Sequence, residues 1–417
     1  MIQLDIWNTQ LWSVSQEKVE QIISTLTTKR DNLGFIDVEK YVDIQKIQDF
    51  VNDVRDDFDS IVILWIGGSA LWTKALLESL YGKYYNEQKN KKWKNIYVLD
   101  NIDADAIADT LQVVNIRRTL FCFISKSGST IETLSEYLFF REQVQCVTAD
   151  WKKHFCFIVG KNCTMRKKLE EDFQCFYIPE NIGGRFSVFT AVWLLPLAFS
   201  GVNISGFLEG IAESRENFLS SDIQKNTALK LALLQYHYYT KEHKNITVFF
   251  PYSSRMFQVG EWYKQLMGES IGKDKKGVTL TSSLGVTDQH SQLQLYQDGP
   301  QDKLFMFLDI LQSNTDYKVT KDIKLSFQKL LKIEKYGTMT SLKNEGHPVC
   351  NISLPKLNEQ NIGELLYMFM FQIAYLWELF EINAFDQPWV EKSKIITKQK
   401  LQEDFGDIDV FHKAFYY

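Results

Sequence analysis

Residues 120–133 have the sequence LFCFISKSGSTIET. Five apolar residues come first, six that are polar or glycine follow, and a helical pattern begins at Ile131. An apolar run that ends in a polar turn and a helix is typical of a parallel α/β sheet. Such a turn presents free backbone N–H groups at the positive end of a helix dipole, where a phosphate group is stabilised. This stretch therefore predicts a fold class and provides a candidate phosphate-binding site.

The same alternation of apolar runs and helical patterns occurs along most of the chain. It predicts parallel strands with helices on both faces of each sheet. The predicted strands are 61–66, 95–99, 120–124 and 154–159 in the first half, and 246–250, 304–310 and 349–354 in the second. The predicted helices of the first half are 71–81, 103–114 and 131–144. We expect an α/β protein with two tandem three-layer αβα domains, parallel sheets, and helical extensions at both ends.

The length of 417 residues supports a division into two domains, because single hydrophobic cores stop growing beyond roughly 250–300 residues. No linker rich in Pro or Ser separates the halves, and a turn at 181–184 is the best boundary. The expected parts are an N-terminal helical segment at 1–36, a first domain at 37–180, a second domain at 181–394 and a tail at 395–417.

Bulk composition excludes some classes of partner. The formal net charge of −5 argues against nucleic-acid binding through general electrostatics. The six cysteines form no CxxC pair and several lie in apolar runs, which indicates buried thiols in a reducing compartment. The first residues lack the pattern of a secretory signal, and the longest apolar stretches, 186–199 and 365–380, fall short of the roughly 18 to 20 residues that span a bilayer. We expect a cytoplasmic protein without membrane or nucleic-acid partners.

A second polar turn, Gly67-Gly68-Ser69, follows the predicted strand 61–66. Its glycines would let the backbone approach a ligand closely. In the turn after residue 124, hydroxyl groups add further hydrogen-bond donors. The alternative interpretation is an ordinary Ser/Thr cap on a helix, and the stretch 125–130 alone does not decide between the two. Two such turns at neighbouring strand ends favour a binding site.

The motif FISKSGSTIET resembles the phosphate-binding motif of sugar isomerase (SIS) domains, and specifically that of the glucose-6-phosphate isomerase family. The resemblance continues in the family's order, from about Ile61 to Lys394, through IGGSAL, IGGRFSVFTAVWLLPLA, GEWYKQLMGESIGKDKKGV, VTDQHSQLQLYQDG and NAFDQPWVEKSK. It implies SIS-type domains and the reversible isomerisation of glucose 6-phosphate to fructose 6-phosphate, a step of glycolysis and gluconeogenesis. The implied route is ring opening followed by a cis-enediolate, with no metal or organic cofactor.

The resemblance also implies roles for particular residues. Glu269 is the base that carries a proton between C2 and C1, a transfer that a carboxylate can perform without a metal. His290 and Lys394 open the sugar ring, and Arg185 stabilises the negative charge of the enediolate. The residues implied to bind substrate or its phosphate are Gly67, Gly68, Ser69, Ser125, Lys126, Ser127, Thr130 and Gln387.

In the family this histidine enters the site from the neighbouring subunit, so the resemblance implies a homodimer in which His290 crosses the interface. Two other interpretations stay open. One is a dual isomerase that also accepts mannose 6-phosphate, and the other is a non-catalytic phosphosugar sensor. A sensor needs residues 125–130 but not Glu269, His290 and Lys394 together. A nucleotide-binding protein is disfavoured, because neither GxGxxG nor GxxxxGK[ST] follows a predicted strand.

Five tryptophans depart from the family pattern, which has glycine at these positions: Trp65, Trp72, Trp193, Trp377 and Trp389. An indole is the largest possible replacement where the backbone must pack closely. One hypothesis explains all five: the codons are UGA, which the source organism reads as glycine, and the sequence was translated with UGA as tryptophan. UGG codons at these positions would exclude the hypothesis, and genuine tryptophans would place close packing around the turns in doubt.

Overall fold

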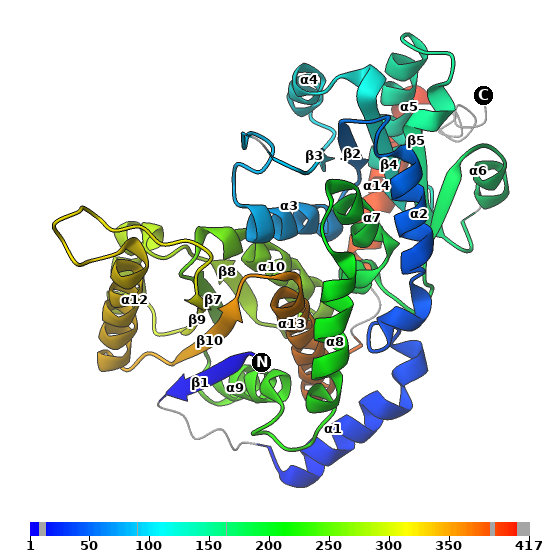
Figure 1. Ribbon diagram of the computed structural model, residues 1–417. Coiled ribbons are helices and arrows are strands. Elements are labelled where there is room, and N and C mark those ends of the chain that lie inside the picture. Colours follow the sequence, from blue (N-terminus) through cyan, green and yellow to red (C-terminus); the bar gives the residue numbers. More distant parts are fainter. Residues whose placement is uncertain (8–13, 90, 164, 384–387, 407–417) are drawn as a thin grey trace. The chain divides into compact units, whose positions relative to one another are not determined.

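The computed structural model describes residues 1–7, 14–89, 91–163, 165–383 and 388–406, without the side chains of 68–72 and 388–391. The chain divides into two compact units (Figure 1). Unit 1 comprises Met1–Asn32, Ala75–Tyr84 and Ser205–Ala384, and unit 2 comprises Leu33–Lys74, Tyr85–Ile204 and Phe385–Tyr417. Each unit contains one five-stranded sheet.

The sheet of unit 2 is entirely parallel, in the order β3-β2-β4-β5-β6. Its strands are β2 (Ser60–Leu64), β3 (Asn95–Leu99), β4 (Thr119–Ser125), β5 (Phe155–Gly160) and β6 (Gln174–Ile178). The helices of this unit are α2 (Ile44–Val54), α4 (Ala104–Val113), α5 (Ile131–Gln145), α6 (Arg166–Asp172), α7 (Ala191–Ser200) and α14 (Pro388–Phe405), and α3 (Gly68–Tyr81) begins in it. Every residue of β2, β4 and β5 is buried, as expected for strands covered on both faces.

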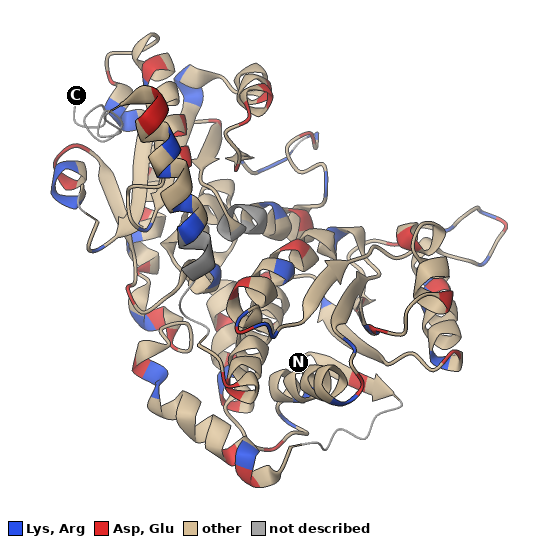
Figure 2. Ribbon diagram, turned by 180° about the vertical axis from the view of Figure 1, so that it is seen from behind, with Lys and Arg blue, Asp and Glu red and all other residues tan. Residues whose placement is uncertain are grey.

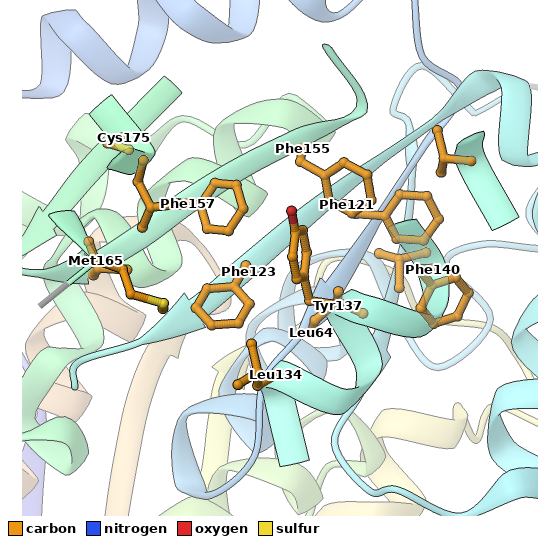
Figure 3. Packing of buried hydrophobic residues seen from close by; sticks show 14 of the residues in the cluster. Leu64, Phe121, Phe123, Leu134, Tyr137, Phe140, Phe155, Phe157, Met165 and Cys175 are labelled. Carbon is orange, nitrogen blue, oxygen red and sulfur yellow. The ribbon is translucent and has the colours of Figure 1, made fainter. Parts of the chain in front are cut away.

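Aromatic side chains fill the core on the α5 face of this sheet (Figure 3). Tyr137 of α5 lies edge-on against Phe155 and Phe157 of β5, with ring centroids 5.1 and 5.4 Å apart. Phe121 and Phe123, which alternate along β4, belong to the same cluster. Edge-to-face pairs of this kind stabilise a core beyond the effect of burial alone. This packing fixes α5, and with it the turn that precedes α5, against the end of β4.

The sheet of unit 1 has the order β1-β10-β9-β7-β8. All pairs are parallel except that of β1 with β10, which is antiparallel. The strands are β1 (Gln3–Trp7), β7 (Ile246–Pro251), β8 (Thr279–Ser282), β9 (Lys303–Gln312) and β10 (Val349–Lys356). The helices are α1 (Gln16–Thr28), α8 (Ile204–Phe218), α9 (Thr227–Lys241), α10 (Phe257–Ile271), α11 (Leu293–Asp298), α12 (Phe327–Asn344) and α13 (Glu359–Phe380). Almost all of α13 is buried, and it packs against α9, α10, α1 and β10.

The predicted fold class is confirmed: the protein is α/β, with two largely parallel sheets. The seven predicted strands all occur, with ends shifted by two residues at most. Three strands were not predicted, β1, β6 and β8. Residues 1–36 were expected to form a helical segment, but Gln3–Trp7 form strand β1. The units group residues by packing and do not test where a domain begins in the sequence, so the expected domain boundaries stay a prediction.

Charged residues are spread over the helices and loops, and most strand positions are uncharged (Figure 2). Among the described residues, every helix is too short or too polar to cross a lipid bilayer.

Candidate active site

The predicted phosphate turn occupies residues 126–130, between the last residue of β4 and the first of α5. Its hydroxyl groups bond to one another: Ser125 Oγ lies 2.9 Å from Thr130 Oγ1, and Ser129 Oγ donates to Ser127 Oγ over 3.0 Å. Thr130 precedes the first residue of α5, yet its side chain makes no capping bond. Thr130 therefore does not act as a side-chain cap of α5, because its Oγ1 faces Ser125 instead of the helix backbone. We call residues 125–130 the cradle.

Gly128 fixes the shape of the cradle. Its φ of +74° is a left-handed conformation that favours glycine, and its N–H donates to Ser125 Oγ over 3.1 Å. A Cβ at this position would lie 2.4 Å from Cys163 Sγ and 3.1 Å from Met165 Cε. Only glycine fits, so the sequence motif carries glycine here for two independent reasons.

A second turn lies beside the cradle. β2 and β4 are paired neighbours, with Leu64 opposite Phe123, so the turn after β2 and the cradle lie at the same edge of the sheet. Gly67 in this turn has a φ of +98°, and a Cβ built on it would meet no atom within 4 Å. The chain adds β3 on one side of β2 and β4 on the other side, so the direction in which strands are added reverses between β2 and β4. Ligands of open α/β sheets bind at such a switch point, outside the carboxyl ends of the strands.

Lys126 connects the cradle to the segment that carries Arg185. Its ammonium donates to the backbone carbonyls of Glu180 and Ile182, over 3.1 and 3.0 Å. Burial lowers the pKa of Lys126, and the nearby Glu180 partly opposes this. Its predicted role as a phosphate ligand stays a prediction, while the observed bonds give it a second role that the sequence did not reveal.

Arg185 begins a buried turn within η5 (Gly184–Phe189) and is itself only 4% exposed. Its guanidinium carbon lies 5.7 Å from the ring centroid of Phe186. A Cβ on Gly184 would meet no atom within 4 Å, so the backbone next to this arginine borders open space. A buried cation beside open space suits the stabilisation of negative charge on a bound molecule.

Glu136 is a buried acid that sequence reasoning did not single out. It lies on α5, six residues after the cradle, and is 1% exposed. Neither of its carboxyl oxygens has a hydrogen-bond partner among the described residues. Burial, together with the nearby Asp100 and Glu132, raises the pKa of Glu136 to about 9. Glu136 is therefore protonated at neutral pH.

Glu269 lies in the last turn of α10 and belongs to unit 1. It is partly buried, and its Oε1 accepts a hydrogen bond of 2.6 Å from Gln265 Nε2, one helical turn earlier. This bond fixes the orientation of the carboxylate. Gln265 was missed from the sequence, although the spacing of four residues on a helix could have indicated it.

His290 ends η7 (Thr287–His290), also in unit 1, and its side chain is exposed. The turn around it is anchored by Asp288, which accepts bonds from the Leu284 N–H over 2.7 Å and from Ser291 Oγ over 2.6 Å. The His290 imidazole makes no hydrogen bond or ion pair with another described residue. A rigid turn thus presents an imidazole outward.

The structure distributes the predicted site residues over the two units. Unit 2 contains Gly67, the cradle, Arg185 and Lys394, the last on the exposed surface of α14. Unit 1 contains Glu269 and His290. Gly68 and Ser69 begin α3, but their side chains are not described, and Gln387 lies outside the described residues. Within the described chain, no three His, Cys, Asp or Glu residues are grouped as metal ligands.

Three of the five unexpected tryptophans have described side chains. Trp193 of α7 is fully buried, and its ring centroid lies 5.6 Å from that of Trp65, directly after β2. Trp377 of α13 is 3% exposed, and its indole N–H donates to Glu378 Oε1 over 2.7 Å. The fold accommodates these three indoles, and the proposed UGA codons stay a prediction. The other two side chains lie outside the description.

The chain was compared with known families, sequences and structures. Residues 38–326 match the model of the phosphoglucose isomerase family. The glucose-6-phosphate isomerase of Methanocaldococcus jannaschii is 34% identical over 408 residues, which cover 96% of this chain and 98% of that protein. A probable glucose-6-phosphate isomerase of Methanococcus maripaludis is 36% identical over 95% of this chain and 91% of that one.

A solved structure of a hypothetical protein from Thermus thermophilus matches with a TM-score of 0.85 and 30% identity. The match covers 96% of this chain and all of that one. Sequence and structure therefore agree along nearly the full length, and this chain belongs to the phosphoglucose isomerase family.

Proposed function

We propose that this chain interconverts glucose 6-phosphate and fructose 6-phosphate as an aldose–ketose isomerase. The observation that carries the proposal is family membership over almost the whole chain, with the cradle motif and the Glu269 motif both present. Support comes from the cradle at a switch point and from a carboxylate held by Gln265. The reaction belongs to glycolysis and gluconeogenesis, and we place it in the cytoplasm.

The proposed mechanism begins with the phosphate group in the cradle. Ser125, Ser127 and Thr130 supply hydroxyl donors, and Gly128 keeps the loop in the required shape. Ser127 is exposed, so its hydroxyl can turn toward a phosphate without leaving a buried donor unpaired, whereas the buried Ser125 keeps its bond from the Gly128 N–H. Holding the phosphate fixes the distal end of the sugar and converts the later steps into reactions within one complex.

Ring opening and proton transfer then follow. We assign His290 and Lys394 to ring opening, which needs a proton delivered to the ring oxygen and one removed from the anomeric hydroxyl. Glu269 takes the C2 proton of the open aldose and returns it to C1. Arg185 stabilises the negative charge that develops on the enediolate oxygens. Gly68, Ser69 and Gln387 stay proposed substrate contacts.

We further propose a homodimer in which His290 serves the site of the partner subunit. The support is that His290 is exposed on an anchored turn and that its imidazole has no hydrogen-bond or ion-pair partner among the described residues. Mixing two inactive variants tests this. A Glu269→Gln chain paired with a His290→Ala chain forms one intact site per heterodimer if the histidine crosses the interface, and none if each chain uses its own. Recovered activity on mixing supports the crossing, and its absence contradicts it.

A coupled assay tests the function itself. Purified protein is given fructose 6-phosphate and the formation of glucose 6-phosphate is followed; mannose 6-phosphate is assayed in parallel. Turnover of fructose 6-phosphate alone establishes the proposed activity, and turnover of both establishes the dual isomerase. Binding of the sugar phosphate without turnover would instead identify a sensor.

A further inference from the structure

The sheets of the two units share a topology. Four consecutive strands of unit 2 have the order β3-β2-β4-β5, and four of unit 1 have the order β8-β7-β9-β10. In both sheets the order reverses at the central pair, β2 with β4 and β7 with β9. All strands in these two sets are parallel. The loops after β7 and β9 therefore correspond to the two turns that form the candidate site of unit 2.

These two corresponding loops line one pocket of about 240 Å³. Residues 252–256 follow β7, and residues 313–326 connect β9 to α12. The residues that carry the argument are Ser253, Ser254, Arg255, Asn314, Thr315 and Lys332. All residues that line the pocket belong to unit 1.

The pocket offers hydrogen-bond donors and positive charge. The side chains of Ser253 and Ser254 make no hydrogen bond to another described residue. Arg255 donates through Nη1 to the carbonyls of Ser79 and Leu80, over 3.5 and 2.9 Å, which leaves its Nε and Nη2 donors for other partners. Lys332 adds an exposed ammonium at the rim, where one of its three donors bonds to the carbonyl of Leu311 over 2.9 Å.

The net charge of the side chains that line the pocket is also positive. Lys335 and Asp309 lie in its wall and form an ion pair of 2.7 Å, so their charges compensate each other. Arg255 has no further acid beside it in the lining, and the acid near Lys332 is Asp316, which lies outside the lining. A cationic pocket in a chain with a net charge of −5 selects for small anions.

We propose that this pocket binds a small phosphate monoester, at a second site separate from the cradle. Hydroxyl donors combined with a guanidinium and an ammonium match the several acceptor oxygens of a phosphate group. The volume lies below the roughly 300–1,000 Å³ of pockets for drug-sized ligands, so it admits a phosphate on a short carbon skeleton and excludes a nucleotide. Binding in this pocket does not depend on isomerase activity.

Calorimetric titration with inorganic phosphate at low ionic strength tests the proposal on the full chain. Four proteins are compared: wild type, Ser127→Asp in the cradle, the pair Ser254→Asp with Lys332→Glu in the pocket, and all three changes together. A new carboxylate repels phosphate and weakens binding at that site by about tenfold or more. We expect two phosphates per wild-type chain, one in each of the two single-site variants, and none in the combined variant.

A matched control is Ser221→Asp with Lys241→Glu, which changes the charge of unit 1 equally at positions outside the pocket. It should bind two phosphates, and thermal melts should show that every variant folds. The proposal is overturned if Ser127→Asp alone abolishes all binding, or if the pocket variant binds as the wild type does. Failure of the proposed function has a different signature: no turnover of fructose 6-phosphate, with phosphate binding in the pocket unchanged.

Discussion

The central strand pairs of the two sheets have the same order but carry different loops. In unit 2 the connection from β4 to α5 is the short cradle, built from hydroxyl-bearing residues around Gly128. In unit 1 the corresponding connection, 313–326, is longer and contains three lysines. Strand order thus determines where loops converge, while loop composition determines what they can bind. Fold alone would not distinguish the two places, and side-chain chemistry does.

The largest expected effect concerns Glu269, the proposed base in the unit without the cradle. Glu269→Gln should lower turnover by at least about 100-fold, because general-base catalysis contributes roughly 10² to 10⁴. The affinity for a sugar phosphate should stay within about threefold of the wild-type value, since the amide keeps the shape of the carboxylate. Steady-state kinetics and calorimetry measure the two quantities.

The matched control for this substitution is Glu261→Gln on the same helix, where the side chain pairs with Lys264. Turnover of this variant should stay within about twofold of the wild-type value. Loss of a surface ion pair changes stability little, so the helix should keep its structure. Full turnover in Glu269→Gln would exclude this residue as the base.

The next largest effect concerns the shape of the cradle. Gly128→Ala should destabilise the fold by about 2–4 kcal/mol, from overpacking against Cys163 and from left-handed backbone strain. It should also remove phosphate binding in unit 2 while leaving the pocket of unit 1 unchanged. Urea denaturation and phosphate titration measure both effects.

Gly337 provides the contrasting substitution, because it lies in the exposed part of α12 and a Cβ there would meet no atom within 4 Å. Gly337→Ala should stabilise the fold by about 0.5–1 kcal/mol through helix propensity. If both alanine substitutions changed the free energy of unfolding in the same direction, the steric explanation for Gly128 would be wrong.

A smaller effect, dependent on pH, is expected from Glu136. Its pKa is raised to about 9 in the folded chain, so the folded state holds a proton that the unfolded state releases above about pH 4.5. Stability contributed by this group is therefore greatest at low pH and falls as pH rises from about 4.5 to 9. Glu136→Gln removes this dependence and should stabilise the fold by about 1–3 kcal/mol at pH 8 and by little at pH 4.5.

Denaturation midpoints at several pH values between 4.5 and 9 measure this difference. Glu142→Gln on the exposed face of the same helix is the control and should show a difference near zero at every pH. A constant offset between Glu136→Gln and wild type across the pH range would mean that the carboxyl is ionised in the folded chain.

Much of the fold could be predicted because its strands are continuous apolar runs. β4, with seven consecutive buried residues, is the clearest case, and the cradle follows it directly. β8 was missed because its four residues, TLTS, are mostly polar, and β1 because its five residues are too few to separate from an irregular segment. Local pattern does not reveal short edge strands, which form only because a partner strand is present.

The site could be predicted only as a set of residues. Motifs indicated Glu269 and His290, but not that Gln265 orients the first or that Asp288 anchors the turn of the second. The bonds of Lys126 to carbonyls more than fifty residues away, and the burial of Glu136, depend on tertiary packing. Sequence identifies chemical groups, whereas their partners and solvent exposure emerge from the fold.

The antiparallel pairing of β1 with β10 bears on how the protein is made. Gln3 lies opposite Ser353, so β1 leaves the ribosome about 350 residues before the strand with which it pairs. Until β10 forms, β1 has no partner strand, and afterwards β1 covers the outer edge of β10; open sheet edges recruit other chains. Deleting the first seven residues would leave that edge open permanently, and the shortened chain should aggregate even where its catalytic groups are intact.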